Sequence, residues 1–341
     1  MSAFWVLVVG TCVVSTSAMQ AGVRVLGVSS TSAMRAGMRA APRLCDVEKT
    51  AMIHPGSKDM PPLVQVPGGS LLLNAIVKPP DLDVLAQWEA ERGNADADSS
   101  WGSVWPAAVN LARYLTDNPD LVKGQRVAEL GSGLGVAGLT AAKVGASAVT
   151  LIDREAYALH CAMSTAVVCG LPTGPVPDGG EDATAFYVEA TAPTSVVSAS
   201  MSDWGALADS GLEVDVVLAS EILYSQQPDV ATAVALAAAA LLKNGGVLLV
   251  ADPAISRVDA SARTVLVEAL RRMGACMIQQ QPIMAPPAGD AWYSLRAGDG
   301  KASVAAPDEA VVLLRADFDG PPDLEMRLDN TQFFGGSEAS L

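Results

Sequence analysis

Short apolar runs alternate with longer amphipathic stretches along most of the chain from residue 101 onward. Short runs rich in Val, Leu and Ala are typical of strands that are buried on both faces of a sheet. Stretches whose apolar residues recur with the period of a helix predict helices between those strands. The predicted strands are 126–130, 148–153, 184–191, 214–220, 245–253, 276–283 and 309–318, and the predicted helices are 106–121, 136–144, 154–170, 230–244 and 258–275.

The alternation of strand and helix predicts the fold class. Right-handed crossovers between such strands give a doubly wound α/β sheet, here seven-stranded and Rossmann-like. The last strand follows its predecessor without a helix, which predicts an antiparallel last strand in a hairpin at the sheet edge. This domain is expected over residues 101–319. Residues 46–100 are expected to be an N-terminal extension with a small hairpin or strand, and residues 320–341 a loose tail.

The first 45 residues have a different composition from the rest of the chain. They contain four arginines and no acidic residue, and the apolar run FWVLVVGTCVV is too short to span a bilayer. The segment STSAMQAGVR recurs as STSAMRAGMR, a composition typical of organelle transit peptides. A targeting leader for a plastid or another organelle is therefore expected, without stable membrane insertion. The alternative is a cytoplasmic protein whose disordered leader has no targeting role.

Charge and cysteine content narrow the possible partners. The formal net charge is −15, and from residue 46 onward 18 basic residues face 37 acidic ones, which gives −19. A surface of that sign repels phosphate backbones, so nucleic acid is not an expected partner, whereas a basic protein segment or a small molecule is. Five cysteines without a CxxC spacing and two histidines predict no metal site. We expect a monomer.

The stretch RVAELGSGLGVAG places a glycine-rich turn between a predicted strand and a predicted helix. Glycine lets the backbone adopt positive φ and approach a ligand closely at the N-terminus of a helix. The spacing Gly133-x-Gly135-x-x-Gly138 fits a dinucleotide fingerprint, whereas Gly131-x-Gly133-x-Gly135 with Glu129 ahead of it fits another nucleoside cofactor. The glycines alone leave both ligands open.

Two further observations disfavour a nicotinamide dinucleotide. The first fingerprint glycine should lie where the strand ends, and the residue at that position is Gly131. Counting from Gly131 puts Val136 where the third glycine should be, and no residue suited to hydride transfer follows in the sequence.

A wider set of segments carries a family resemblance. The order WGSVWPAA, VAELGSGLGVAGLTAAKVGA, TLIDRE, SDWGAL, VDVVLASEILYS and GGVLLVADP resembles the seven-strand S-adenosylmethionine-dependent methyltransferases. More narrowly, it resembles the lysine-methyltransferase-like branch called methyltransferase family 16. The resemblance covers residues 101–253 and continues more weakly to residue 318. It implies an S-adenosylmethionine-dependent N-methyltransferase that acts on a lysine or another nitrogen of a protein.

The resemblance assigns residues to the cofactor. Asp153, at the end of the second predicted strand, is implied to bind the ribose hydroxyls, a task that suits a carboxylate. Trp204 with Asp203 is implied to flank the adenine, and Trp105 to close the other side of the pocket. Outside the pattern, the two tryptophans could equally be core residues. The implied cofactor-binding residues are Trp105, Glu129, Gly131, Ser132, Gly133, Gly135, Asp153, Asp203, Trp204 and Ser220.

The segment SEILY is implied to be the reaction centre. The family usually has Asp-x-x-Tyr at this place, whereas this chain has Glu221 and Tyr224. Both would lie at a strand end facing the ligand crevice, where they could orient the acceptor nitrogen and take up its proton. The longer glutamate leaves the acceptor open among lysine, histidine and another nitrogen. Alternatively, Glu221 only caps the helical turn that follows it.

Two other functions remain open. One is a small-molecule methyltransferase, for which residues 46–100 could provide a lid. The other is a catalytically silent, methyltransferase-like interaction domain, although the complete set of cofactor residues argues against it.

Overall fold

The computed structural model describes residues 63–68, 71–79, 82–91, 99–173, 196–223, 229–254, 261–283 and 311–324. The predicted leader, the predicted strand at residues 184–191, the catalytic candidate Tyr224 and the tail from residue 325 lie outside the described residues.

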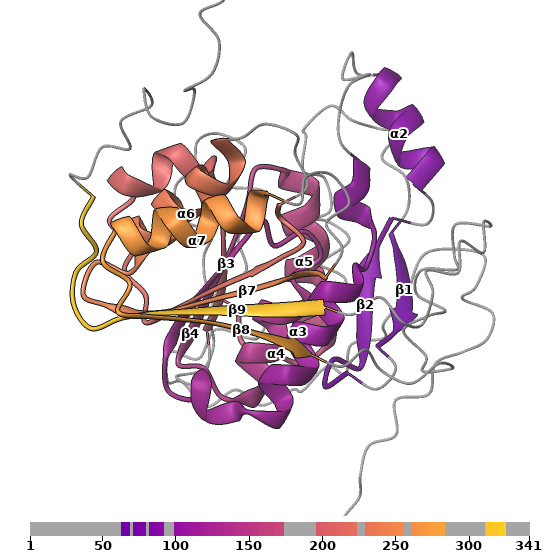
Figure 1. Ribbon diagram of the computed structural model, residues 1–341. Coiled ribbons are helices and arrows are strands. Elements are labelled where there is room, and N and C mark those ends of the chain that lie inside the picture. Colours follow the sequence, from indigo (N-terminus) through magenta and orange to yellow (C-terminus); the bar gives the residue numbers. More distant parts are fainter. Residues whose placement is uncertain are drawn as a thin grey trace, which may run out of the picture.

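Seven strands form one mixed sheet in the order β5-β4-β3-β6-β7-β9-β8 (Figure 1). Five neighbouring strands are parallel, and β9 runs antiparallel to both β7 and β8. This confirms the predicted doubly wound fold with an antiparallel last strand. The last strand enters between β7 and β8, so β8 is the edge strand. The bounds are β3 (Arg126–Leu130), β4 (Ala148–Asp153), β5 (Val196–Met201), β6 (Val216–Ser220), β7 (Gly246–Pro253), β8 (Met277–Ile283) and β9 (Val311–Phe318).

One strand of the sheet lies at a place that the sequence pattern did not predict. The position next to β4 is occupied by β5, whose residues VVSASM alternate small polar and apolar side chains after the first two valines. Ser198 of β5 lies within 3.2 Å of Thr150 of β4, hydroxyl oxygen to hydroxyl oxygen. Serine and alanine fill half of β5, whereas residues 184–191 contain Phe, Tyr, Val and Thr, which are enriched in strands, so the pattern favoured that stretch.

Helices cover both faces of the sheet. On one face, α3 (Pro106–Asp117), α4 (Val136–Val144) and α5 (Ala156–Val168) contribute to one apolar cluster. The short helix η3 (Pro119–Leu121) follows α3 in the chain. On the other face, α6 (Asp229–Leu241) and α7 (Ala262–Arg272) contribute to a second cluster with η5 (Trp204–Asp209) (Figure 1). Among the described residues, none of the helices is both long and apolar enough to cross a membrane.

The N-terminal extension packs into the main core. Strands β1 (Val64–Pro67) and β2 (Ala75–Lys78) form the expected antiparallel hairpin, and β2 lies against α5 (Figure 1). The N–H of Val77 donates to the Thr165 hydroxyl over 2.8 Å. After the hairpin, α2 (Leu82–Glu91) packs against η2 (Ser99–Gly102). Leu73, Ile76 and Leu85 of this extension thus share a core with the predicted catalytic domain.

The strand order fixes where a ligand can bind. Chain connections lead away from β3 in opposite directions, through β4 to β5 and through β6 to β7. Such a switch point opens a crevice outside the carboxyl ends of the strands, because the flanking crossovers leave toward opposite faces. The glycine turn after β3 lies at this crevice.

Candidate active site

A cavity of about 790 Å³ lies at the carboxyl ends of the central strands. Its walls come from residues 100–105, the glycine turn, the ends of β4, β6 and β7, the start of η5, and α6. Nine predicted site residues line it, and none of the described residues from 63 to 91 does. The nine are Trp105, Gly131, Ser132, Gly133, Asp153, Asp203, Trp204, Ser220 and Glu221. The fold therefore brings together, in one cavity, residues from five separate segments that the family resemblance implied.

The glycine turn needs glycine for two different reasons. Gly131 has φ +58°, and a Cβ there would lie 2.8 Å from Cγ2 of Ile222. Gly133 has φ +49°, and its Cβ would lie 3.4 Å from the carbonyl oxygen of Trp101. Both positions therefore require the left-handed conformation, and Gly131 also requires the absence of a side chain. Both glycines line the cavity.

Ser132 carries a buried hydroxyl without a partner in the described structure. It lines the cavity and is only 7% exposed, while its backbone N–H donates to the carbonyl of Ile152 over 3.0 Å. A buried polar atom without a partner costs free energy, and a polar ligand in the cavity would supply one. Ser132 is therefore a contact point for a bound polar group.

Asp153 is engaged with the backbone through both of its carboxylate oxygens. Oδ2 accepts a hydrogen bond from the N–H of Gly133 over 2.7 Å, and Oδ1 accepts one from the N–H of Glu155 over 2.9 Å. Burial raises the pKa of the carboxyl, and these backbone donors oppose that shift. Asp153 thus fixes the glycine turn against the end of β4.

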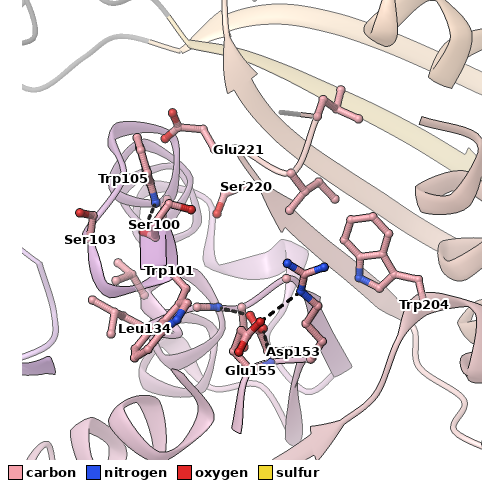
Figure 2. A pocket seen from close by; sticks show the side chains of 18 of the residues that line it. Ser100, Trp101, Ser103, Trp105, Leu134, Asp153, Glu155, Trp204, Ser220 and Glu221 are labelled. Carbon is pink, nitrogen blue, oxygen red and sulfur yellow. Dashed lines mark hydrogen bonds and ion pairs between the residues drawn. The ribbon is translucent and has the colours of Figure 1, made fainter. Parts of the chain in front are cut away.

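Glu155 is a cavity residue that the sequence analysis missed. Its carboxylate lines the same wall as Asp153 (Figure 2), and its Oε1 lies 3.3 Å from Nε of Arg154 in a partly exposed ion pair. Burial raises its pKa, while the positive charge of Arg154 lowers it. The sequence signal that could have found it is the Asp-x-Glu spacing, which places a second acid two residues after the end of β4. Glu155 is half-exposed and can therefore reach a ligand.

Glu129, which the resemblance implies to be a cofactor residue, is not among the residues that line the cavity. Its carboxylate is buried and accepts a hydrogen bond from the N–H of Gly138 over 2.8 Å. A Cβ at Gly138 would lie 2.7 Å from the same carboxylate oxygen, so the glycine leaves room for it. Burial raises the pKa of Glu129 to about 8. Glu129 therefore anchors the first turn of α4 to β3 behind the glycine turn.

Gly135 is likewise behind the cavity wall. It precedes α4 with φ +73°, and its Cβ would approach Ala162 to 3.0 Å and Leu151 to 3.1 Å. Gly135 therefore lets α4 pack closely on β4 and α5, which is a structural role.

Aromatic side chains approach the cavity from opposite sides. Figure 2 shows Trp105 and Trp204 on the two sides of the site, with Trp101 beside Leu134. The indole N–H of Trp105 donates to the carbonyl of Ser100 over 3.0 Å. Trp101, which the sequence analysis did not assign to the cavity, packs edge-on against Tyr157 with ring centroids 5.3 Å apart. Flat apolar walls of this kind suit a purine ring.

Asp203 stands next to Trp204 at the cavity rim. It occupies the N-cap position of η5, where its side chain makes no capping hydrogen bond, and it is exposed. It adds negative charge to the rim.

The far end of the cavity is formed by the segment after β6. Ser220 ends the strand, and Glu221 follows with φ +51°. Oε2 of Glu221 accepts a hydrogen bond from the backbone N–H of Ala107 in α3 over 3.0 Å. This bond joins the segment after β6 to a helix far away in the sequence, while the turn that Glu221 could cap lies mostly outside the described residues.

Asp252 is a further acid at this end that the sequence analysis missed. It lines the cavity at the end of β7, and its Oδ2 accepts a hydrogen bond from Nη2 of Arg263 over 2.7 Å. The same guanidinium nitrogen donates to the carbonyl of Pro253. The pair connects the end of β7 to the start of α7. No local sequence pattern joins two residues on either side of a loop in this way.

The cavity residues fit S-adenosylmethionine, the cofactor that the resemblance implies. The unpartnered hydroxyl of Ser132 can donate or accept a hydrogen bond, and the partly exposed carboxylate of Glu155 can accept hydrogen bonds from ribose hydroxyls or an amino group. Trp204 provides an apolar wall for an adenine. The cavity volume lies in the range of sites for ligands of that size.

Comparison with known proteins finds similarity to the same family over part of the chain. Residues 89–169 match the sequence model of a lysine methyltransferase family. The human electron transfer flavoprotein beta subunit lysine methyltransferase is 37% identical over 82 residues, which cover 23% of this chain and 31% of the human protein. The zebrafish protein N-lysine methyltransferase METTL21A is 50% identical over 52 residues, which cover 15% of this chain and 23% of that protein.

The structural comparison covers more of the chain at lower identity. A putative RNA methyltransferase from Pyrococcus horikoshii is 15% identical, with a TM-score of 0.41 over 65% of this chain and 90% of that one. The chain spans about a third of the length of the human relative that it matches. The resemblance to the lysine-methyltransferase-like family is confirmed by the family match, which covers residues 89–169.

Proposed function

We propose that this protein is an S-adenosylmethionine-dependent N-methyltransferase that methylates a lysine side chain of a protein. The observation that carries this proposal is the shape of one cavity. It joins the glycine turn and Glu155 at one end to Glu221 at the other. A cofactor and an acceptor nitrogen can therefore meet inside a single space.

At the end of the cavity near the glycine turn, we assign each side chain to the part of the cofactor that it could contact. Glu155 is the carboxylate that we place on the ribose hydroxyls, because both oxygens of Asp153 already accept backbone hydrogen bonds. Ser132 is placed on a polar group of the cofactor, and Trp204 on the adenine. When bound, S-adenosylmethionine supplies an activated methyl group. The chain's own residues hold and orient the reactants.

The acceptor end must handle a proton. A lysine amine has an ordinary pKa of about 10.4, so holding it neutral at pH 7 costs about 4–5 kcal/mol. The negative charge of Glu221 can bind the incoming ammonium and orient it, and the carboxylate can accept the released proton directly or through water. Tyr224 is assigned beside it by the family resemblance. Positioning the nitrogen in line with the methyl group would supply much of the acceleration.

The proposed partner is a protein with a basic segment. Among the described residues, five acids line the cavity against one lysine or arginine, which is Arg154. Since the chain from residue 46 onward carries a net charge of −19, a cationic segment would also be attracted over a longer distance. The five acids are Asp153, Glu155, Asp203, Glu221 and Asp252.

The name of the human relative gives a first acceptor to try. That relative is a methyltransferase for the electron transfer flavoprotein beta subunit. We propose the same subunit as a candidate acceptor for this chain. We also propose that the protein acts as a monomer and that residues 1–45 direct it to an organelle, on the basis of their Arg-rich, acid-free composition.

Two measurements test this function. Titration calorimetry with S-adenosylhomocysteine should show binding, whereas NAD should give no heat at the same concentrations. Incubation of the purified electron transfer flavoprotein beta subunit with S-adenosylmethionine should then add methyl groups to lysine, as read by peptide mass spectrometry. Binding of NAD in place of S-adenosylhomocysteine would overturn the assignment.

A further inference from the structure

The N-terminus of α3 has no cap from its own neighbourhood. Trp105 occupies the N-cap position, and its side chain makes no capping hydrogen bond. Pro106 has no N–H, so Ala107 is the first residue of the helix with a donor. Ala107 is fully buried, and a buried N–H without an acceptor is strongly unfavourable.

The acceptor for Ala107 is the side chain of Glu221, in the segment after β6. Oε2 of Glu221 accepts from the N–H of Ala107 over 3.0 Å across 114 residues of sequence. The backbone of Glu221 is held at the sheet, because its own N–H donates to the carbonyl of Ala251 over 2.9 Å. Glu221 therefore connects the C-terminal end of β6 to the start of α3.

The backbone of Glu221 shows that this placement is imposed by its surroundings. Among the described residues, it is the only residue other than glycine with positive φ, at +51°. A long side chain rarely adopts this conformation, and such outliers persist where neighbouring interactions determine them. The bonds to Ala251 and Ala107 fix both ends of the residue.

We propose that Glu221 is a positioning residue that ties the acceptor end of the cavity to α3 and thereby sets the wall formed by Trp105. This inference rests on the proposed function and adds a second task to the same side chain. Trp105 directly precedes the helix turn that Glu221 holds, and it lines the cavity. If the helix start shifts, the indole shifts with it. Cofactor affinity should then depend on a residue at the acceptor end.

Substitutions that change either the length or the charge of Glu221 separate its proposed positioning of α3 from its proposed role at the acceptor nitrogen. Aspartate keeps the charge but is one methylene shorter, so from the same backbone it cannot reach Ala107. Glutamine loses the charge but keeps the length, and its carbonyl oxygen can accept from the N–H of Ala107. Aspartate is the residue that the family usually has at this place. The structure thus implies that the family's usual residue is the poorer one in this chain.

The test compares Glu221→Asp and Glu221→Gln in the full chain, with Glu213→Asp as the matched control. Glu213 is an exposed glutamate outside the cavity that accepts a hydrogen bond from Asn244, so it reports the loss of a methylene alone. We expect Glu221→Asp to weaken S-adenosylhomocysteine binding at least about tenfold by calorimetry, or about 1.4 kcal/mol. We also expect it to lower the melting temperature by a few degrees. Glu221→Gln and Glu213→Asp should bind S-adenosylhomocysteine within about twofold of the wild type.

The outcomes separate this inference from the proposed function. Wild-type S-adenosylhomocysteine affinity in Glu221→Asp would overturn the positioning role, whatever the transfer activity. Loss of that affinity in Glu221→Gln would also overturn it, because a charge and not a length would then be needed. An absence of methyl transfer by the wild type, together with normal S-adenosylhomocysteine binding, would instead contradict the proposed function and leave the positioning result standing.

Discussion

The carboxylate of Asp153 accepts a hydrogen bond from the backbone N–H of Gly133 over 2.7 Å, and this bond ties the end of β4 to the turn after β3. Its other oxygen accepts from the N–H of Glu155 over 2.9 Å. Asp153 is therefore an internal clamp between two loops. The next acid along the chain, Glu155, is left to face the cavity.

Exchanging these two acids for their amides should separate ligand contact from clamping. We expect Glu155→Gln to weaken S-adenosylhomocysteine binding about tenfold with little change in melting temperature, since charge-assisted hydrogen bonds contribute about 1.5–3 kcal/mol. Asp153→Asn should lower both affinity and melting temperature, because the amide has one acceptor oxygen for two backbone donors and its NH2 group would face the N–H of Gly133 or of Glu155. Calorimetry and thermal unfolding measure the two effects. An unchanged affinity in Glu155→Gln would return the ribose contact to Asp153.

The glycine turn gives a second prediction with a matched control. A Cβ at Gly131 would lie 2.8 Å from Ile222, whereas at Gly170, with φ +68°, it would have nothing within 4 Å. Gly170→Ala should therefore cost only the backbone strain, about 1 kcal/mol, and keep full cofactor affinity. Gly131→Ala should destabilise more and weaken S-adenosylhomocysteine binding at least about tenfold. Equal effects of the two variants in urea unfolding and calorimetry would mean that crowding at Gly131 is unimportant.

The sheet was largely predictable because its central strands are buried on both faces. Val127 and Leu151, for example, lie in short apolar runs whose contrast with the flanking turns marks each strand. The strand next to β4 was not predictable in this way. Ser198 and Ser200 interrupt its apolar pattern, and the hydroxyl contact of Ser198 with Thr150 depends on a neighbour that the sequence does not identify.

The site was predictable where the residue type alone determines its position. Gly131 and Gly133 of the glycine turn and Trp204 of the segment SDW carry recognisable patterns, and they line the cavity. The direction in which an acid points was not predictable. Glu129 points toward α4, where its carboxylate accepts a hydrogen bond from the N–H of Gly138. Glu155 instead faces the cavity. The bond from Ala107 to Glu221 likewise depends on the tertiary fold.

His160 should make the stability of the fold depend on pH. Burial lowers its pKa to about 4, against an ordinary value of 6.5, so the unfolded chain binds more protons between these values. Stability is therefore complete above pH 6.5 and is lost as the pH falls toward 4, by on the order of 3 kcal/mol. Urea unfolding of the wild type and of His160→Phe across this range isolates the effect.

Other groups titrate over the same range, and the comparison removes them. Burial raises the pKa of Glu129 to about 8, so its folded form binds more protons and its contribution to stability falls as the pH rises. That trend is opposite to the trend from His160 and is present in both proteins. Parallel pH profiles for the wild type and His160→Phe would show that His160 is not the source.

The N-terminal hairpin and α2 should be required for folding. Leu73, Ile76 and Leu85 are buried in the cluster that also contains α3, α4 and α5. Burial of three such side chains contributes about 5–9 kcal/mol, which is comparable with the whole stability of a domain. A chain that begins at residue 61 should melt cooperatively like the full chain, and one that begins at residue 101 should not. A cooperative melting transition in the shorter chain would place the domain boundary at residue 101.

The central claim is that this cavity transfers a methyl group from S-adenosylmethionine to a protein nitrogen. The direct measurement is incubation of the purified protein with methyl-labelled S-adenosylmethionine and a dialysed cell extract, followed by hydrolysis of the labelled proteins to amino acids. We expect label in methyllysine with the wild type and a loss of about 10²–10⁴-fold with Glu221→Gln, which should still bind S-adenosylhomocysteine. A folded wild-type protein that binds S-adenosylhomocysteine but transfers no label to any protein amino acid would contradict the account.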